Sequence, residues 1–428
     1  MPKISQLDQQ YVWHPYTQHA LEQEPLAVVR GEGSKIYLED GSSLIDGISS
    51  WWVNLHGHAH PHITARLNQQ LLELHHVIFA GFTHRPAVEL AEKLLHRLPG
   101  NQAKIFFSDN GSTAVEVAVK MAVQACLNRG RAARKVVAFS NSYHGDTFGA
   151  MSLSARGGFF RPYEEMLLET RFLPAPSNSS GEESAEALEE ALCQGDVAAF
   201  IFEPLVQGAG GMKFYSADLL NTLLSICRKH AVFTIADEVF TGFGRTGKLF
   251  ACEYLKESPD IITLSKGISG GTLPLGATSC TEEIFGCFLS DERARMLVHG
   301  HSYTANPLAC AAALASLELL ELEETKKSIV RIAETQNRLR DELAEAPDFT
   351  DARVLGTIFA CELLQKGESG SYYSSLRDKL YRFFLSRGVL LRPLGNTVYC
   401  VPPYCTTEEE LLQIHSAIRD AAQALKEL

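Results

Sequence analysis

The stretch that decides the fold runs from residue 231 to 271 and reads AVFTIADEVFTGFGRTGKLFACEYLKESPDIITLSKGISGG. Its two continuous apolar runs, 231–238 and 260–266, predict buried strands, because strands covered on both faces lack the alternation of half-exposed strands. Asp237 stands at the end of the first run and Lys266 at the end of the second. We therefore expect both charged side chains at one edge of a sheet.

Three further runs upstream have the same character. They are KIFFS (104–108), KVVAFS (135–140) and DVAAFIFE (196–203), and helical patterns such as STAVEVAVKMAVQACL lie between them. Alternating strands and helices with continuous apolar strands predict an α/β fold with a mostly parallel, covered sheet. Polar residues follow each strand, and open α/β sheets bind ligands at the carboxyl ends of their strands.

The pattern of alternating strands and helices ends near residue 306. The segment 307–346 predicts one long helix or two in series, and the sequence shows no break. Short strands at 357–363, 388–393 and 396–403, a helix near 373–387 and a final helix near Thr406 complete a smaller α+β domain. Residues 1–50 contain a hairpin-like stretch and are expected to pack with it. The predicted division is 1–50, then a large domain 51–309, then a small domain 310–428.

Composition excludes several function classes. The chain has 428 residues, a formal net charge of -12 and a pI of about 5.7, so it is a poor candidate for binding nucleic acid or an anionic membrane. No apolar run approaches the roughly 18 residues of a membrane span. The ten cysteines are dispersed without a CxxC pair, which favours reduced thiols, and the first residues lack the apolar core of a signal peptide. The expected location is the cytoplasm.

Lys266 and Asp237 together indicate a chemistry. Schiff-base formation needs a lysine that is close to neutral and sterically free, although a solvated surface lysine is the commoner case. A buried carboxylate at a strand end needs a partner, and the ring nitrogen of pyridoxal 5'-phosphate is one. A helix cap or a metal site shared with Glu238 is the alternative, and nearby histidines are lacking.

Two more strand ends could complete a cofactor site. Gly111 and Ser112 begin a predicted helix, where free N–H groups and the helix dipole favour an anion such as a phosphate, although plain N-capping would look the same. Tyr143 follows the next strand and could stack on a flat ring or simply belong to the core. Each signal is weak alone, but one cofactor would require all of them in this order.

Several blocks of the chain resemble the class III aminotransferases. The blocks IFEPLVQGAGGM, ADEVFTGFGRTGKLFACE, LSKGISGGTLPLGAT and ANPLACAAALASL carry the resemblance over nearly the whole chain. It implies the type I pyridoxal-phosphate fold: a large domain with a mostly parallel seven-stranded sheet, and a smaller α+β domain. It also implies that Lys266 holds the cofactor as a Schiff base and moves the proton. Asp237 would pair with the ring nitrogen, Gly111 and Ser112 would hold the phosphate, and Tyr143 would stack on the ring and touch substrate.

Four further blocks narrow the resemblance within the class. WHPYTQ (13–18), SSWWVNLHGHAHP (49–61), YHGDTFGAMSLS (143–154) and LLRPLGNTVYCVPPY (390–404) resemble the branch that acts in biotin synthesis. That branch transaminates 8-amino-7-oxononanoate to 7,8-diaminononanoate, with S-adenosylmethionine as the expected amino donor and lysine as the open alternative. The resemblance implies that Tyr16 takes part in catalysis and lines the substrate pocket with Trp51 and Trp52. Arg392 would bind the substrate carboxylate.

The block HGHSYTANP (299–307) departs from the usual family pattern. His301 and Ser302 stand where a proline–threonine pair reaches the phosphate of the partner subunit. Ser302 keeps a hydroxyl, so the phosphate contact can survive, and Gly300 beside it would border the substrate. The resemblance thus implies a two-fold homodimer with shared active sites.

Three other functions are compatible with these residues. One is a class III transaminase of a diamine or an ω-amino acid, against which the Tyr16 and Trp51–Trp52 blocks speak. Another is a pyridoxal-phosphate isomerase of the same fold, which would share the cofactor residues. The last is a non-catalytic paralogue, which the intact lysine, aspartate and tyrosine set disfavours.

Overall fold

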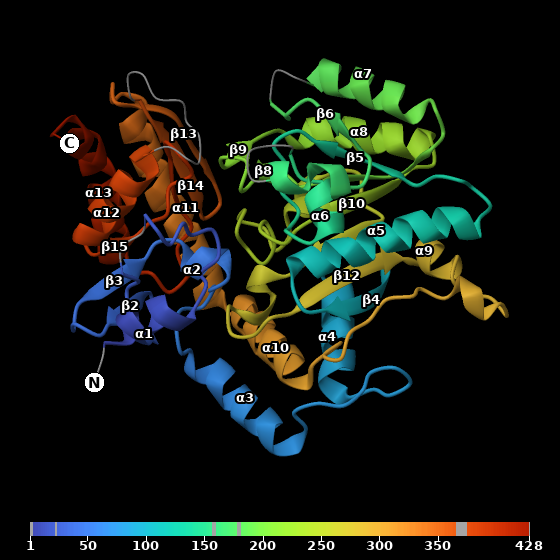
Figure 1. The fold of residues 1–428 in the computed structure, drawn as a ribbon, viewed down its shortest axis with the longest axis horizontal. Helices are drawn as coiled ribbons and strands as arrows, with labels where there is room; N and C mark the ends of the chain where they lie inside the picture. Colours follow the sequence, from blue (N-terminus) through green and yellow to red (C-terminus); the bar gives the residue numbers. More distant parts are fainter. Residues whose placement is uncertain (1–2, 22–23, 156–159, 178–180, 365–374, 428) are drawn as a thin grey trace.

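The larger region of the protein is built on one seven-stranded sheet (Figure 1). The computed structural model describes residues 3–21, 24–155, 160–177, 181–364 and 375–427. In spatial order the strands of this sheet are β4 (Gln102–Ser108), β12 (Gly276–Thr281), β11 (Ile261–Leu264), β10 (Phe233–Asp237), β7 (Val197–Phe202), β5 (Lys135–Phe139) and β6 (Thr170–Leu173).

The sheet is parallel except at β12, which pairs antiparallel with both β4 and β11. The mostly parallel sheet is therefore as predicted, and the five strands expected from apolar runs are all present as β4, β5, β7, β10 and β11. β6 and β12 were not predicted, because TRFL is short and GATSCT lacks a continuous run of large apolar residues.

Both faces of this sheet are covered by helices. Alternate strand residues enter two separate apolar clusters: Val136 and Ile235 lie in one, whereas Val137 and Ala236 lie in the other. Helix α5 (Gly111–Asn128) supplies the first cluster, and the second is built with α4 (Arg85–Leu95), α7 (Gly181–Leu192), α8 (Ala217–Lys229) and α10 (Pro307–Glu321). This double covering explains why the strands read as continuous apolar runs.

The smaller region holds both chain termini (Figure 1). Its antiparallel sheet contains β13 (Phe349–Leu355), β14 (Ile358–Leu363) and β16 (Thr397–Cys400). Its helices are α11 (Glu323–Ala344), α12 (Ser375–Ser386) and α13 (Glu408–Glu427). The expected final helix is confirmed, and Thr407 and Glu410 cap it reciprocally. The helix expected near 373–387 corresponds to α12, and residues 373 and 374 lie outside the described residues.

The N-terminal hairpin joins a strand from the far end of the chain. The sheet order is β1 (Val28–Glu32), β2 (Lys35–Leu38), β3 (Ser43–Asp46) and β15 (Val389–Leu390). β3 and β15 run parallel, with Ile45 opposite Val389. Backbone pairing therefore ties the N-terminal strands β1–β3 to the C-terminal part of the chain.

The long helical segment after residue 306 is two helices. α10 ends at Glu321 and α11 begins at Glu323, because Leu322 adopts an extended conformation with ψ 136°. α10 is buried on nearly all sides, whereas α11 buries only one stripe. Because of this break, α10 packs in the large region and α11 packs in the small region.

The segment labelled α2 (Ser49–Trp52) is a left-handed turn. All four residues have positive φ, at 51°, 47°, 75° and 74° along the chain. The Trp52 N–H donates to the Ile48 carbonyl at 2.7 Å and closes the turn. Since this conformation costs an L-residue roughly 1–2 kcal/mol, four in a row persist only where the surroundings hold them.

The remaining elements are short or peripheral. They are α1 (Ile4–Tyr11), α3 (Pro61–Glu73), α6 (Phe148–Ser152), η1 (Arg161–Met166), β8 (Val206–Gln207), β9 (Lys213–Phe214), η2 (Ala251–Tyr254), η3 (Lys266–Ser269), α9 (Glu282–Gly286) and η4 (Arg293–Arg295). Within the described parts of the chain, no helix combines the length and the apolar character that a membrane crossing requires.

Candidate active site

A cavity of about 720 Å³ opens at the carboxyl ends of the parallel strands. Segments from β4, β5, β7, β10 and β11 all reach it, as the polar strand ends predict. Its lining includes Trp52, Asn110, Gly111, Ser112, Tyr143, His144, Asp146, Thr147, Glu203, Asp237, Phe240 and Lys266.

Lys266 is the first residue of η3, directly after β11 and Ser265. Its ammonium lies 5.0 Å from the Trp52 ring centroid, and among the described residues it has no hydrogen-bond partner. Burial lowers the pKa of this ammonium below its usual range, although the carboxylates of Asp237, Glu203 and Asp146 oppose the shift. The shift is toward the neutral form that a nucleophilic amine requires.

Asp237 ends β10 inside the cavity and is almost fully buried. Its Oδ2 lies 2.7 Å from Nδ1 of His144, and its Oδ1 accepts from the Val239 N–H at 3.1 Å and from the Thr263 hydroxyl at 3.3 Å. Since an ionised carboxylate only accepts, we assign the shared proton to the His144 nitrogen. Sequence reasoning missed His144, although it stands next to Tyr143.

The adjacent Glu238 has a different task. Its carboxylate accepts from the Thr241 hydroxyl at 2.6 Å and from the N–H groups of Ala251 and Cys252 at 3.0 and 2.6 Å. It therefore anchors the loop after β10, and burial raises its pKa. The two neighbouring carboxylates do not converge on one point, which argues against the alternative of a shared metal site.

The N-terminus of α5 faces the cavity. Asn110 is the N-cap, and its side chain accepts from the Thr113 N–H at 2.9 Å. The N–H groups of Gly111 and Ser112 have no acceptor among the described residues. Capping is thus done by Asn110, and two donors are left for an anion.

The space around residue 111 leaves no room for a side chain, so glycine is required there. A Cβ at this position would lie 2.7 Å from Cγ1 of Val239, which is closer than real Cβ contacts allow. Ser112 is fixed beside it, because its hydroxyl lies 2.7 Å from the Thr147 hydroxyl and accepts from the Thr147 N–H at 3.0 Å. Glu116 holds Thr147 in turn at 2.6 Å.

Three polar side chains meet at the outer wall of the cavity. The Tyr16 hydroxyl lies 2.7 Å from both carboxylate oxygens of Asp146, across 130 residues of sequence. Burial raises the pKa of the nearby Tyr143 phenol, and the charge of Asp146 adds to the shift. Sequence reasoning missed Asp146, which occupies the loop that follows Tyr143 and His144.

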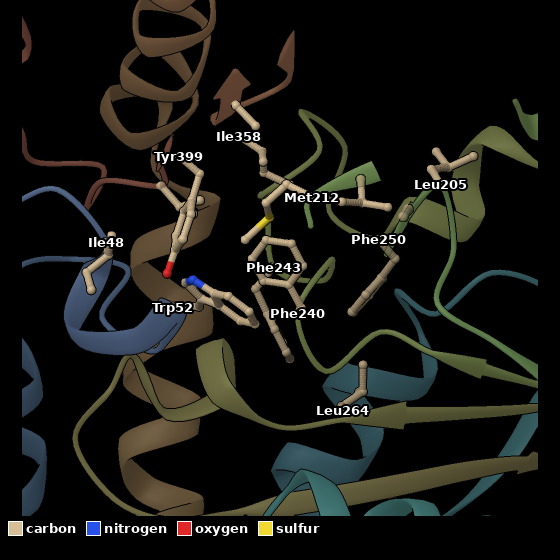
Figure 2. Packing of buried hydrophobic residues seen from close by; sticks show 14 of the residues in the cluster. Ile48, Trp52, Leu205, Met212, Phe240, Phe243, Phe250, Leu264, Ile358 and Tyr399 are labelled. Atoms are coloured by element: carbon tan, nitrogen blue, oxygen red, sulfur yellow. The ribbon is translucent and has the colours of Figure 1, made fainter. Parts of the chain in front are cut away.

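The tryptophan pair divides between two environments. Trp52 is buried and packs on Phe240 with ring centroids 4.5 Å apart and on Tyr399 at 6.0 Å (Figure 2). Trp51 is 38% exposed; its ring lies 5.9 Å from that of Tyr16 and 5.1 Å from the Arg392 guanidinium.

Arg392 lines a second cavity, of about 500 Å³, rather than the first. Tyr16 borders this second cavity while it bonds Asp146 in the first. The two cavities therefore meet at the Tyr16–Asp146 contact.

Gly300, His301 and Ser302 do not line either cavity. Gly300 and Ser302 are exposed, and His301 is half-buried in a turn where its Nδ1 accepts from the Tyr303 N–H at 3.2 Å. The structure thus places these three residues away from the other predicted site residues of the same chain.

Glu203 is a buried group that sequence reasoning left without a role. Its two oxygens accept from the N–H groups of Tyr143 and Gly208 at 3.0 and 2.9 Å. Burial raises the pKa of this carboxyl to about 7; the charge of His144 opposes the shift and that of Asp237 adds to it. Glu203 thereby holds the backbone that carries Tyr143.

Glu203 should make stability depend on pH. The folded protein keeps this proton up to about pH 7, whereas the unfolded chain loses it near 4.5. The free energy of unfolding should therefore fall by roughly 3 kcal/mol between pH 4.5 and 7 from this group, and stay constant above pH 7. Denaturant titrations at several pH values should show this fall in the free energy of unfolding for the cofactor-free wild-type protein. The Glu203→Gln variant should not show it. Glu324→Gln, at an exposed position, is the control; parallel profiles for Glu203→Gln would contradict the assignment.

Comparison with known proteins supports the resemblance. The family Aminotransferase class-III matches residues 16–422. A protein of Synechococcus elongatus called adenosylmethionine-8-amino-7-oxononanoate aminotransferase is 48% identical over 419 residues, which cover 96% of this chain and 98% of that protein. A Corynebacterium glutamicum protein of the same name is 38% identical over 428 residues, covering 99% of each.

Solved structures give the same result for the fold. The adenosylmethionine-8-amino-7-oxononanoate aminotransferase of Methanocaldococcus jannaschii superposes with a TM-score of 0.93 at 34% identity, covering 99% of this chain and 98% of that one. An omega transaminase of Pseudomonas jessenii in complex with PMP has a TM-score of 0.92 at 29% identity, covering 100% and 98%. The expected type I fold is confirmed. With a family match over residues 16–422 and 48% identity to a full-length relative, the chain belongs to the class III aminotransferases.

Proposed function

We propose that this aminotransferase uses pyridoxal 5'-phosphate to convert 8-amino-7-oxononanoate to 7,8-diaminononanoate in biotin synthesis, with S-adenosylmethionine as amino donor. The names of the relatives at 48% and 38% identity support the substrate pair. The observation that carries the chemistry is the cavity that joins a buried carboxylate with a lysine amine and two N–H groups that have no hydrogen-bond partner in the described part of the chain.

The residues fit pyridoxal phosphate at three points. The free N–H groups of Gly111 and Ser112 at the α5 N-terminus suit its phosphate. The Asp237 carboxylate suits a protonated ring nitrogen, and the Lys266 amine suits its aldehyde carbon. When bound, this cofactor supplies a ring that withdraws electrons from the carbon bearing the amine.

Lys266 would hold the cofactor covalently until the donor amine replaces it, and would then carry the proton from the donor carbon. Its lowered pKa makes the neutral amine available for that transfer. Asp237 would keep the ring nitrogen protonated, and His144 fixes that carboxylate through the 2.7 Å contact. Tyr143 would cover the ring, on backbone held by Glu203.

The substrate would lie outward of the cofactor, where the two cavities meet. Asp146 presents a carboxylate there, held by the Tyr16 hydroxyl, and suits the ammonium of either substrate. Tyr16, Trp51 and Trp52 would form the aromatic walls. Arg392 would bind the substrate carboxylate from the second cavity.

The Arg392→Met variant should raise KM for 8-amino-7-oxononanoate by about 10- to 100-fold, because a hydrogen bond to a charged group is worth ~1.5–3 kcal/mol. Initial rates across a range of ketone concentrations would measure it. Arg387→Met removes a nearby exposed arginine, which pairs with Asp420, and serves as the control. An unchanged KM in Arg392→Met would show that Arg392 does not bind the substrate carboxylate.

The site is proposed to be shared across a homodimer. The turn that carries Gly300, His301 and Ser302 contacts the segment after α3, since the rings of His76 and Tyr303 lie 5.1 Å apart. Exposed apolar side chains in α3, in the segment that follows it and in the stretch before the turn are Leu71, Leu72, Ile78, Phe82, Met296, Val298 and Tyr303. Exposed apolar side chains of this kind favour burial against a second copy.

In that dimer, Ser302 would donate to the partner's phosphate, with His301 beside it, and Gly300 would border the partner's substrate. Sedimentation equilibrium should give twice the chain mass of 47.1 kDa. A mass of 47.1 kDa at micromolar concentration would contradict the proposed shared site.

The ten cysteines, all of them unbridged, support a cytoplasmic location.

A spectral titration tests the whole proposal. The purified protein, loaded with pyridoxal phosphate, should lose its near-visible absorbance band when S-adenosylmethionine is added and regain it with 8-amino-7-oxononanoate. A response to lysine instead of S-adenosylmethionine would change the donor. A band that ignores the ketone would favour a diamine or ω-amino acid transaminase, and a protein that forms no band would point to a non-catalytic paralogue.

A further inference from the structure

One buried carboxylate makes more side-chain hydrogen bonds to the left-handed turn α2 than any other described residue. Asp46 has no exposed surface, and its Oδ1 accepts from the N–H groups of Ser50 at 2.8 Å and Ile48 at 3.4 Å. Its Oδ2 accepts from the Ser50 hydroxyl at 2.7 Å and lies 3.0 Å from Nε2 of His58. No other side chain among the described residues makes this many hydrogen bonds to the turn.

The carboxylate is itself tied to the N-terminal hairpin. The Asp46 N–H donates to the Ser34 carbonyl at 2.8 Å, and His58 exchanges backbone hydrogen bonds with Gly33 at 2.7 and 3.3 Å. The far side of the turn is secured separately, because the Ser49 hydroxyl donates to the Val401 carbonyl at 2.8 Å. Asp46 therefore connects a rigid sheet edge to the strained residues.

The handedness of the turn separates two consecutive indoles. Trp52 packs against Phe240 and Tyr399 (Figure 2). The Lys266 ammonium lies 5.0 Å from the centroid of the Trp52 ring. Trp51 points in another direction, toward the ring of Tyr16 and the guanidinium of Arg392. A right-handed turn, which L-residues prefer, would aim both side chains elsewhere.

We propose that Asp46 is a positioning residue for substrate binding: by holding α2 left-handed it places Trp51 on the substrate wall and Trp52 on the wall beside Lys266. Asp46 has no exposed surface and lines neither cavity, so it acts through the turn and not by contact with substrate. Trp51 lines neither cavity itself, but it contacts Tyr16 and Arg392, which line the second. The inference rests on the proposed function only where it assigns Trp51 to the substrate wall.

The Asp46→Ala variant should disturb the tryptophans while it spares the cofactor residues. The near-ultraviolet circular dichroism of the indoles should weaken, because Trp51 and Trp52 are two of three tryptophans and Trp13 is 89% exposed. KM should rise for both substrates and kcat/KM should fall by about 10- to 100-fold, since a shift of about 1 Å in a positioning group can cost on the order of a hundred-fold. The cofactor absorbance band and kcat should stay close to wild type.

Two further variants make the test specific. Asp40→Ala removes a carboxylate with the same chemistry, which accepts from the Ser42 N–H and hydroxyl at 2.9 and 2.6 Å in an exposed turn, and should change neither readout. Adding Ser50→Gly to Asp46→Ala should recover part of the dichroism and of KM, because glycine enters the left-handed region without strain.

The outcomes are decisive whether or not the proposed reaction is right. Wild-type dichroism and KM in Asp46→Ala, or a double variant no better than the single one, would overturn the inference. If Asp46→Ala does not fold, Ser50→Ala, which loses only one hydrogen bond, must shift both readouts in the same direction. If the wild-type protein were inactive on these substrates, the proposed function would be wrong. The near-ultraviolet circular dichroism of the wild type and the variants would still test the role of Asp46.

Discussion

Lys266→Ala is expected to abolish amino transfer while the protein still folds. The amine would be both the covalent anchor of the cofactor and the group that moves the proton, so the variant loses more than the ~10²–10⁴-fold of a positioned general base alone. The fold should survive, because the Lys266 side chain makes no hydrogen bond to the described residues; its ammonium lies over the ring of Trp52. Single-turnover formation of product from S-adenosylmethionine and 8-amino-7-oxononanoate measures the loss.

A matched lysine separates chemistry from packing. Lys248 also places its ammonium over an aromatic ring, that of Tyr254 at 4.2 Å, but it is half-buried, donates to the Glu253 carbonyl at 2.8 Å and lies outside the cavity. Lys248→Ala should keep full activity. A small primary amine added to Lys266→Ala should restore part of the proton transfer, since it can enter the space of the lost side chain. Substantial turnover by Lys266→Ala without added amine would exclude this lysine as the catalytic base.

Asp237→Ala is expected to weaken cofactor binding and to lower kcat by on the order of 10²–10³-fold, the loss typical of a preorganised electrostatic contact. Without this carboxylate the ring nitrogen is not held protonated, and the ring withdraws electrons less well. The removal also leaves Nδ1 of buried His144 without its 2.7 Å partner. Spectral titration with pyridoxal phosphate and steady-state rates at saturating cofactor would separate the two effects.

Asp260 is the control, a half-buried aspartate next to a strand of the same sheet. Its carboxylate accepts from the Thr234 N–H and hydroxyl at 2.8 and 2.7 Å, before β11 begins and away from the cavity. Asp260→Ala should lose stability, yet its folded fraction should bind cofactor normally. If Asp237→Ala behaved in the same way, Asp237 would be a structural residue only.

Local sequence was sufficient for the main architecture. The apolar runs at 231–238 and 260–266 correspond to β10 and β11, because strands covered on both faces are apolar at every position. The same runs set Asp237 and Lys266 at strand ends, which parallel pairing then brings to one edge. The capping pattern at Thr407 likewise depends on residues three positions apart.

Other elements depend on neighbours that are distant in the chain. β12 reads as GATSCT, and only its place between β4 and β11 makes it a strand. Leu322 breaks the segment into α10 and α11 without glycine or proline, because the two halves pack in different regions. The Ser49–Trp52 turn has no glycine either, so its left-handed form reflects the hydrogen bonds around it.

By itself, then, the sequence determined five strands of the seven-stranded sheet, the order of the strand-end residues and their resemblance to an aminotransferase. Only the tertiary structure decided which of those residues touch. His144 bonds Asp237 across 93 residues, Tyr16 bonds Asp146 across 130, and Arg392 lies in a second cavity rather than the first. The physical reason is range: strand and cap patterns are set by near neighbours, whereas a buried polar group takes whichever partner the folded chain brings within hydrogen-bond distance.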